Sequence, residues 1–534
     1  MPTTEFLLAS PSWRISPGGD RRAWAPLPSF ADAALEAGPA DAALASLAGH
    51  WALACDSGGS TLLAVDRMRS LGLLYAFDGT RWIVSDEVGA LLARLASPRL
   101  DVEQARIFES YGYALGEETL IEGVFSVEAG SIVELRPDGS RIARSFAGYR
   151  RPADPIEDPA DFAVAFSAAL DATVGRMLDA AGERPLVLPL SGGLDSRLLL
   201  ARLARLGATR VSAFTYGKAG AGEIGVSKRV AEAFGVPWTV VDYPPDRMRA
   251  LWAGDEGEAF RRANWCGVSL PHVQDWFALR EMSGDGRLPE DAILLPGHTI
   301  VGNSHDEGLA LSGPPAARLA RIIARHHAQG RGADRLVDSS ASIARAVERA
   351  AREVGYDGSG PSALSWLEWF NLRERQAKYI NHSMRAYEFF GRTWAAPMLD
   401  VEMWATWLDG SVALTKNREW YARFVAEEVA RSATGDAPAV HAPSNDHGMP
   451  PALKRATLAA MRATGADALL SRSRSIRTML DHPMSFEAFS APLSPLAQAG
   501  AHLAGESSTS LWSRLFVANS WGSSVRILPE RDPR

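Results

Sequence analysis

The sequence predicts a mixed α/β protein: an α+β, sandwich-like domain at the N-terminus, then an α/β domain with a doubly wound parallel sheet and a helical C-terminal part. Two patterns predict this class. Short β-prone runs separated by turn residues fill the first 150 residues. From residue 159 onward, apolar runs alternate with helical periodicity, as in a parallel sheet covered by helices. The expected domains are 1–150, 159–435 and a C-terminal helical extension or tail, 436–534.

The elements of the N-terminal part are short apolar or alternating runs bounded by turn residues. Cys55 ends one of them, where a buried apolar role is expected. Residues 151–158 hold two prolines and three acids, and they read as a linker. The strands expected before this linker are 51–55, 60–65, 73–77, 81–85 and 131–135.

The elements of the second part alternate between helix and strand. Beyond about residue 310 the pattern is mostly helical, with a loop at 435–451 and little pattern in the last 40 residues. The elements expected between the linker and that region are a helix at 161–181, a strand at 185–190, a helix at 197–206, a strand at 211–216, a helix at 223–234 and a strand at 237–243.

The bulk composition excludes several classes of protein. The length of 534 residues predicts two or three domains, and a net charge of −7 argues against nucleic acid as the main partner. A short basic patch at 472–477 is expected to be a solvated helix end. Two cysteines, Cys55 and Cys266, cannot make a disulfide framework. Since no signal peptide or apolar membrane span is apparent, we expect a cytoplasmic protein without a membrane partner.

The six residues Ser191-Gly192-Gly193-Leu194-Asp195-Ser196 lie between a predicted strand and a predicted helix. A glycine turn at a helix N-terminus gathers backbone N–H groups and so forms an anion site. Asp195 is a natural ligand for a Mg²⁺ ion that rides on phosphates. The loop lacks the lysine of a Walker loop and the glycine spacing of a Rossmann turn.

This loop resembles the pyrophosphate loop of the ATP pyrophosphatases, as found in the asparagine synthetase family. Segments 65–75 and 118–130 also resemble the N-terminal glutaminase domain of that family, which implies an Ntn-type domain. The family's nucleophile is a cysteine at residue 2, and here that residue is Pro2. The stretches that hold glutamine are also missing, so the resemblance implies a degenerate glutaminase domain.

The resemblance assigns site residues beyond the loop. Glu223, at a helix start, is either a ligand of Mg²⁺ or ATP or an ordinary N-terminal helix charge. His298 lies where the family has a second pyrophosphate loop, with acids only at Asp306 and Glu307, and it either donates to a phosphate or caps a turn. The implied ATP-binding set is Ser191, Gly192, Gly193, Leu194, Asp195, Ser196, Thr215, Tyr216, Gly217 and Gly297, with Asp195 as the Mg²⁺ ligand and Asp195, Glu223, His298 and Glu388 as catalytic residues.

The acceptor segment 394–400 departs from the family pattern. Thr393 and Ala395 stand where the family has a glutamate and an arginine. Glu388 is a candidate substitute for that glutamate, or a solvated or paired acid on a long helix spanning 366–390. Lys416 and Lys454 are the candidates for the lysine that the family carries after this region.

The resemblance implies an ATP-dependent, AMP- and pyrophosphate-forming ligase. It would activate a small-molecule or peptide carboxylate as an acyl-adenylate for attack by ammonia or an amine, without using glutamine. One alternative is intramolecular amide formation, as in β-lactam synthetase or lasso-peptide cyclase. The other is a non-catalytic nucleotide-binding or regulatory protein. The implied cofactors are ATP and Mg²⁺, and a homodimer is left open.

Overall fold

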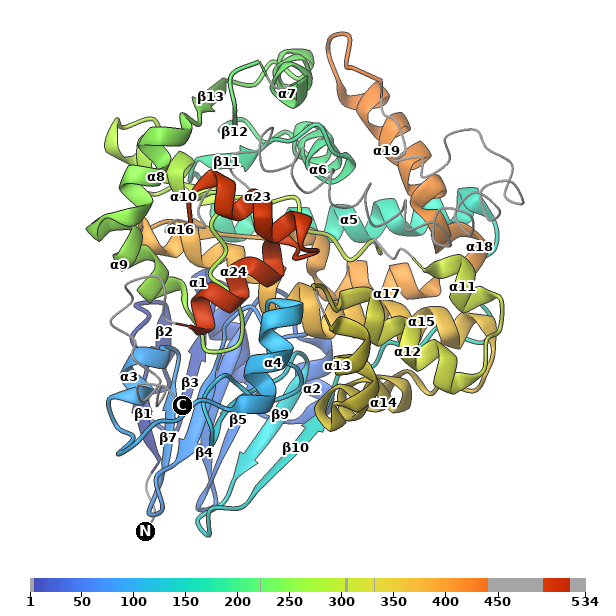
Figure 1. The fold of residues 1–534 in the computed structure, drawn as a ribbon. Coiled ribbons are helices and arrows are strands. Elements are labelled where there is room, and N and C mark those ends of the chain that lie inside the picture. The colour runs from blue at the N-terminus through green and yellow to red at the C-terminus, as the bar shows by residue number, and fades with distance from the viewer. Residues whose placement is uncertain (1–3, 221, 303–305, 331, 440–492, 519–534) are drawn as a thin grey trace.

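The computed structural model describes residues 4–220, 222–302, 306–330, 332–439 and 493–518 (Figure 1). Two sheets form the N-terminal part, at the lower left of Figure 1. The parallel sheet and its helices lie above them in the same view. They contain residues 191–196, the loop that the sequence predicts to bind phosphate, which is named the phosphate loop below. The predicted segments 440–451 and 472–477, and Lys454, lie outside the described residues.

The N-terminal part has a four-stranded and a six-stranded sheet. All of their pairings are antiparallel except that of β1 with β7. The α+β prediction for this region is confirmed, while an Ntn-type arrangement stays a prediction. The four-stranded sheet has the order β1 (Glu5–Leu7), β7 (Trp82–Ser85), β6 (Leu74–Phe77), β8 (Val124–Ser126). The six-stranded sheet has the order β10 (Arg141–Ser145), β9 (Ser131–Leu135), β5 (Ser60–Val65), β4 (Ala52–Ser57), β3 (Arg21–Trp24), β2 (Trp13–Ile15), and the helices are α1 (Pro28–Ala37), α2 (Asp41–Ser46), α3 (Val88–Leu92) and α4 (Val102–Tyr111).

The second part is built on a five-stranded sheet in which every pairing is parallel. This confirms the predicted parallel sheet. The strand order reverses between β11 and β14, and such a switch point is where ligands bind in this class of sheet. Its strands are, in spatial order, β13 (Trp238–Asp242), β12 (Val211–Gly217), β11 (Leu186–Pro189), β14 (Ile293–Leu294) and β15 (Thr393–Trp394), and its first helices are α5 (Pro159–Ala181), α6 (Leu194–Arg205) and α7 (Gly222–Ala233).

The rest of the described chain is mostly helical, as predicted, with two corrections. The expected long helix at 366–390 is interrupted by a π-helical stretch, Asn371–Ile380, and a 3₁₀ turn, Asn381–Met384. The C-terminal residues that showed little pattern contain α23 (Pro495–Leu503) and α24 (Ser508–Val517). The other helices are α8 (Pro245–Ala253), α9 (Asp255–Asn264), α10 (Trp276–Gly284), α11 (Glu307–Leu311), α12 (Ala316–His327), α13 (Ala333–Ser339), α14 (Ala341–Val354), α15 (Gly360–Phe370), α16 (Arg385–Phe389), α17 (Val401–Asp409), α18 (Val412–Thr415) and α19 (Glu419–Ser432).

Buried polar contacts fix helix α6, whose N-terminus follows the phosphate loop. Arg202 is fully buried and pairs with Asp171 on α5 and with Glu428 on α19, at 2.7 Å from the latter. A buried arginine needs such partners because its charge has lost its water. The helix is therefore held on two sides, and the loop that precedes it has a rigid base.

The two parts of the chain share contacts. Gly49 donates its backbone N–H to Asp400 at 2.8 Å, and the His50 ring bonds the carbonyl of Ala396 at 3.1 Å. The expected linker at 151–158 is partly packed, because Arg151 is buried against Glu368 at 2.9 Å. Among the described residues, no helix is both long and apolar enough to cross a membrane.

Candidate nucleotide-binding site

The phosphate-loop residues lie at the switch point of the parallel sheet. Strand β11 ends at Pro189, and α6 begins at Leu194, so the loop joins a strand end to a helix N-terminus. The segment after β14 lies against it: a Cβ on Gly297 would be 2.9 Å from the backbone nitrogen of Ser196. Only glycine permits this approach, so the structure brings Gly297 together with the loop.

Side-chain oxygens accept the N–H groups of the loop. Gly193 donates to Ser191 Oγ at 3.1 Å, and Ser191 donates to Ser196 Oγ at 3.3 Å. Gly192 donates to Glu223 Oε1 at 3.4 Å, across from α7. A carboxylate oxygen therefore lies where this backbone N–H would meet an anionic ligand.

Asp195, in the first turn of α6, forms an ion pair. Its Oδ1 lies 2.7 Å from an Arg418 guanidinium nitrogen and accepts the Tyr421 hydroxyl at 2.8 Å. Burial raises the pKa of the Asp195 carboxyl, while Arg418 and Tyr421 oppose that rise. Arg418 Nε is buried without a hydrogen-bond partner among the described residues. Arg418 is thus a cation beside the loop, and its Nε–H group is not engaged in a hydrogen bond within the described residues.

Arg418 was missed at the sequence level, although Lys416 two residues earlier was a candidate. Asn417 and Arg418 both have left-handed backbones, with φ of 60° and 58°. Such angles cost energy in residues other than glycine, so surrounding contacts must hold them. No sequence signal marks this turn, because its partners come from distant parts of the chain.

Glu307 is one of those partners. Its Oε2 accepts the backbone N–H of Asn417 at 2.7 Å, and the residue is only 5% exposed. Burial raises the pKa of Glu307 to about 7, against the hydrogen bond from Asn417, which lowers it. Glu307, one of the two acids that follow the expected second pyrophosphate loop, therefore supports the turn that carries Arg418.

The residues expected to hold adenine lie at the end of β12. Thr215 Oγ1 donates to the Leu190 carbonyl at 2.6 Å, so its side chain ties β12 to the start of the loop. The Tyr216 hydroxyl donates to Asp275, whose other oxygen accepts the Tyr387 hydroxyl at 2.7 Å. Gly217 ends the strand. The side chains of Thr215 and Tyr216 thus serve packing and hydrogen bonding within the protein.

His298 directly follows Gly297 and therefore lies beside the loop. Burial lowers the pKa of His298 to about 4, so its ring is neutral at pH 7. Its Nδ1 has no hydrogen-bond partner among the described residues. A neutral imidazole has one donor and one acceptor nitrogen, so it can offer a single hydrogen bond to an anionic ligand.

Glu388 does not lie beside the phosphate loop. It lines a separate cavity of about 360 Å³, together with Thr393 and with Arg184 just before the start of β11. Its Oε1 accepts from Trp394 Nε1 at 2.8 Å and pairs with Arg385. The structure brings Glu388 close to the Thr393 position, but it places both at the end of the sheet opposite the phosphate loop.

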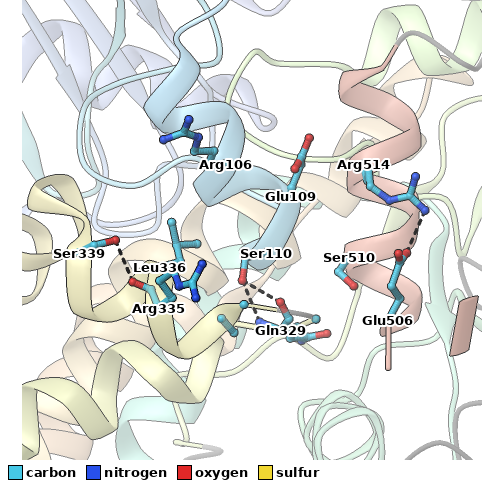
Figure 2. Close-up of a pocket in the computed structure, with 13 residues that line it drawn as sticks. Arg106, Glu109, Ser110, Gln329, Arg335, Leu336, Ser339, Glu506, Ser510 and Arg514 are labelled. Atoms are coloured by element: carbon cyan, nitrogen blue, oxygen red, sulfur yellow. Dashed lines mark hydrogen bonds and ion pairs between the residues drawn. The ribbon is translucent and has the colours of Figure 1, made fainter. Parts of the chain in front are cut away.

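A further cavity, of about 460 Å³, lies between α4, α13 and α24 (Figure 2). Ser110 donates to the Gln329 carbonyl at 2.8 Å, and Arg514 pairs with Glu506 at 3.0 Å. The phosphate-loop residues do not line it. It therefore contributes nothing to the candidate site.

One family model matches part of the chain. Residues 165–263 match the family model described as asparagine synthase. This part of the chain is therefore similar to asparagine synthase. The match contains the phosphate loop, Glu223 and the strands β11 to β13. No curated protein matches the chain by sequence.

Three solved structures show local similarity to this chain. The NH3-dependent NAD synthetase of Campylobacter jejuni is 13% identical over 30% of this chain and 62% of its own, with a TM-score of 0.18. The glutamine-dependent NAD+ synthetase of Acinetobacter baumannii is 15% identical over 51% and 52%, with a TM-score of 0.18. The glutamine PRPP amidotransferase of B. subtilis is 11% identical over 50% and 52%, with a TM-score of 0.13. The chain thus spans less than two thirds of the length of each of these proteins.

Proposed function

We propose that this protein is an ATP-dependent amide ligase that forms AMP and pyrophosphate. The observation that carries the proposal is the loop 191–196 at the switch point, with Gly297 packed against Ser196 and a carboxylate on the Gly192 N–H. A strand end, a helix N-terminus and close glycines make an anion site that a triphosphate fits. The match of residues 165–263 to asparagine synthase supports the same function.

Each residue of the site would have a distinct role. Asp195 would supply one oxygen to Mg²⁺, and phosphate oxygens and water would supply the others, as is usual for this ion. Arg418 would turn its spare donor to the phosphates and stabilise the leaving pyrophosphate. The neutral His298 ring would donate one hydrogen bond. Backbone groups of 215–217 would read the adenine.

The proposed reaction has two steps. A carboxylate oxygen of the substrate attacks the α-phosphorus, and the bond from that phosphorus to the β-phosphate oxygen breaks, releasing pyrophosphate. An amine or ammonia then attacks the acyl carbon, loses a proton, and displaces AMP. The chain's part is to hold the phosphates in line and to neutralise the charge that develops on them.

The nitrogen source would be free ammonia or an organic amine rather than glutamine. The N-terminal part would be a degenerate, Ntn-type glutaminase domain with Pro2 in place of a nucleophile. Burial raises the pKa of Cys55 to about 11, so this thiol is not available as a substitute. Intramolecular amide formation, with both groups on one substrate, belongs to the same proposal.

One observation favours a second candidate, a nucleotide-binding protein without turnover. Arg418 pairs with Asp195, the carboxylate that Mg²⁺ would need. If this pair persists with nucleotide bound, the metal has no protein ligand at the loop.

One experiment separates the two. Binding of Mg·ATP is measured directly, and release of pyrophosphate and AMP is measured with a panel of carboxylates plus ammonium, amines or glutamine. Turnover with ammonium or an amine but not with glutamine supports the ligase. Binding without turnover across the panel supports the second candidate, and absence of binding contradicts both.

A further inference from the structure

Cys266 lies at the junction of the two parts of the chain, on the wall of a cavity. It follows α9, and the next residues pair with the N-terminal part: Leu120 donates to the Gly267 carbonyl at 2.9 Å. The cavity has a volume of about 740 Å³, and Cys266 and His382 both line it. A small solute in this cavity therefore reaches both residues.

A buried cation lies beside this cysteine. Arg69 is 3% exposed, and its guanidinium donates to Ser126 Oγ from Nε at 3.1 Å and from Nη2 at 2.7 Å. Among the described residues, no carboxylate lies within 4.0 Å of it. Gly72 lines the cavity, and a Cβ added to it would lie 2.8 Å from Arg69 Nη2. Arg69 is therefore close to the cavity wall. A buried charge without a carboxylate calls for another anion, and the Cys266 thiol is the first group that favours the charged form of Arg69.

His382 and Ser269 complete the surroundings of the sulfur. His382 Nε2 bonds the Asn264 carbonyl, and since a carbonyl only accepts, this nitrogen carries a proton. The other ring nitrogen is then left for the cysteine. Ser269 Oγ lies 3.6 Å from Sγ. Burial alone would raise the pKa of the Cys266 thiol, but His382, Arg69 and Ser269 outweigh it and bring the pKa to about 5.

We propose that Cys266 is a nucleophilic thiolate, and that the cavity exposes it to peroxides as a site of oxidative modification. The thiolate attacks one peroxide oxygen, an S–O bond forms and the O–O bond breaks. Sulfur is oxidised to the sulfenic acid, the peroxide is reduced, and the leaving hydroxide or alkoxide takes a proton from the solvent. This step needs only a thiolate, a proton donor and access, which the cavity supplies.

The other cysteine is a control within the same chain. Cys55 is 2% exposed on β4, and burial raises its pKa to about 11. Reagents that require a thiolate should therefore distinguish the two positions in a single sample.

The test uses the full chain and maps modified peptides by mass spectrometry. Iodoacetamide is applied between pH 5 and 9, and hydrogen peroxide with dimedone at pH 7. We expect Cys266 to be alkylated at nearly the same rate at pH 7 and pH 9, whereas an ordinary thiol of pKa 8.5 would gain about 25-fold. Dimedone should label Cys266 and leave Cys55 unlabelled. An ordinary pH profile at Cys266, or equal labelling of both cysteines, overturns the proposal.

Two variants sharpen the result. His382→Gln should slow the alkylation of Cys266 at pH 6 by about tenfold, by removing a side chain that lowers the pKa of this thiol. Arg385→Gln changes a cation that lines the same cavity and should leave the rate unchanged. If His382→Gln does not fold, as judged by circular dichroism, the pH profile of the natural chain decides alone. An unchanged rate in folded His382→Gln contradicts the role of His382.

Discussion

The two ends of the parallel sheet carry different chemistry. Where β11 and β14 end, glycines, hydroxyls and one carboxylate–arginine pair surround the N-terminus of α6. Where β11 and β15 begin, Arg184, Thr393 and Glu388 line a cavity, and the latter two side chains are bonded to neighbouring groups. The N-terminus of α6 faces the first of these ends, because α6 follows the end of β11. The proposed anion site therefore belongs to that end of the sheet.

The largest expected effect separates the two ends by their carboxylates. Asp195→Ala should lower Mg·ATP-dependent pyrophosphate release by about 100-fold or more, because the loop loses its proposed metal ligand. Glu388→Gln, at the other end, should change the same rate by less than about twofold. Pyrophosphate assays and circular dichroism of both variants check this. Equal losses in the two folded variants would contradict the assignment of the site to the loop.

The next effect tests the close approach of the second loop. Gly297→Ala should weaken ATP binding by about tenfold or more, because the new Cβ would lie 2.9 Å from Ser196 N and push the loops apart. Gly308→Ala, in α11, meets nothing within 4 Å and is the matched control. Calorimetric titration with a non-hydrolysable ATP analogue measures both. Unchanged affinity in Gly297→Ala would mean that the nucleotide binds elsewhere.

Arg418 distinguishes the two candidate functions. If it binds phosphate, Arg418→Gln should weaken ATP binding by about tenfold, since a charge-assisted hydrogen bond is lost. If it blocks Asp195, the same change should strengthen Mg·ATP binding. Arg431→Gln, which removes an exposed arginine of α19, is the control. Titrations of each variant with ATP, with and without Mg²⁺, show whether the affinity falls or rises.

The smallest effect concerns the support of the Arg418 turn. The pKa of Glu307 is raised from its ordinary value of 4.5 to about 7 in the folded protein. Its burial therefore lowers the stability of the fold progressively between about pH 4.5 and 7, and the loss stays constant above that range. Glu307→Gln keeps the acceptor for Asn417 without the charge. We expect its melting temperature to equal that of the natural chain at pH 4.5 and to exceed it by about 2–4 °C at pH 8. A difference that does not vary with pH would contradict the raised pKa.

Local patterns were enough to predict the strands and the phosphate loop. The run before Ser191 and the leucines after it have periods that depend only on neighbouring residues, and β11, α6 and β12 follow them. The glycines at 192 and 193 predict an anion site for the same local reason. The π-helical break at 371–380 and the bounds of α23 and α24 were not predicted, because packing against distant segments decides them.

The sequence by itself determined the loop between β11 and α6 and the class of sheet that carries it. Only the tertiary structure decided which other residues join the loop: it added Arg418 and Glu307, kept Gly297 and His298, and left Glu388 at the opposite end. It also set Cys266 beside Arg69 and His382, while Cys55 stayed buried in a strand. The physical reason is the separation along the chain over which each kind of interaction acts. Strand and helix periods act over a few residues, whereas a buried charge is satisfied by whatever partner the folded chain brings within reach.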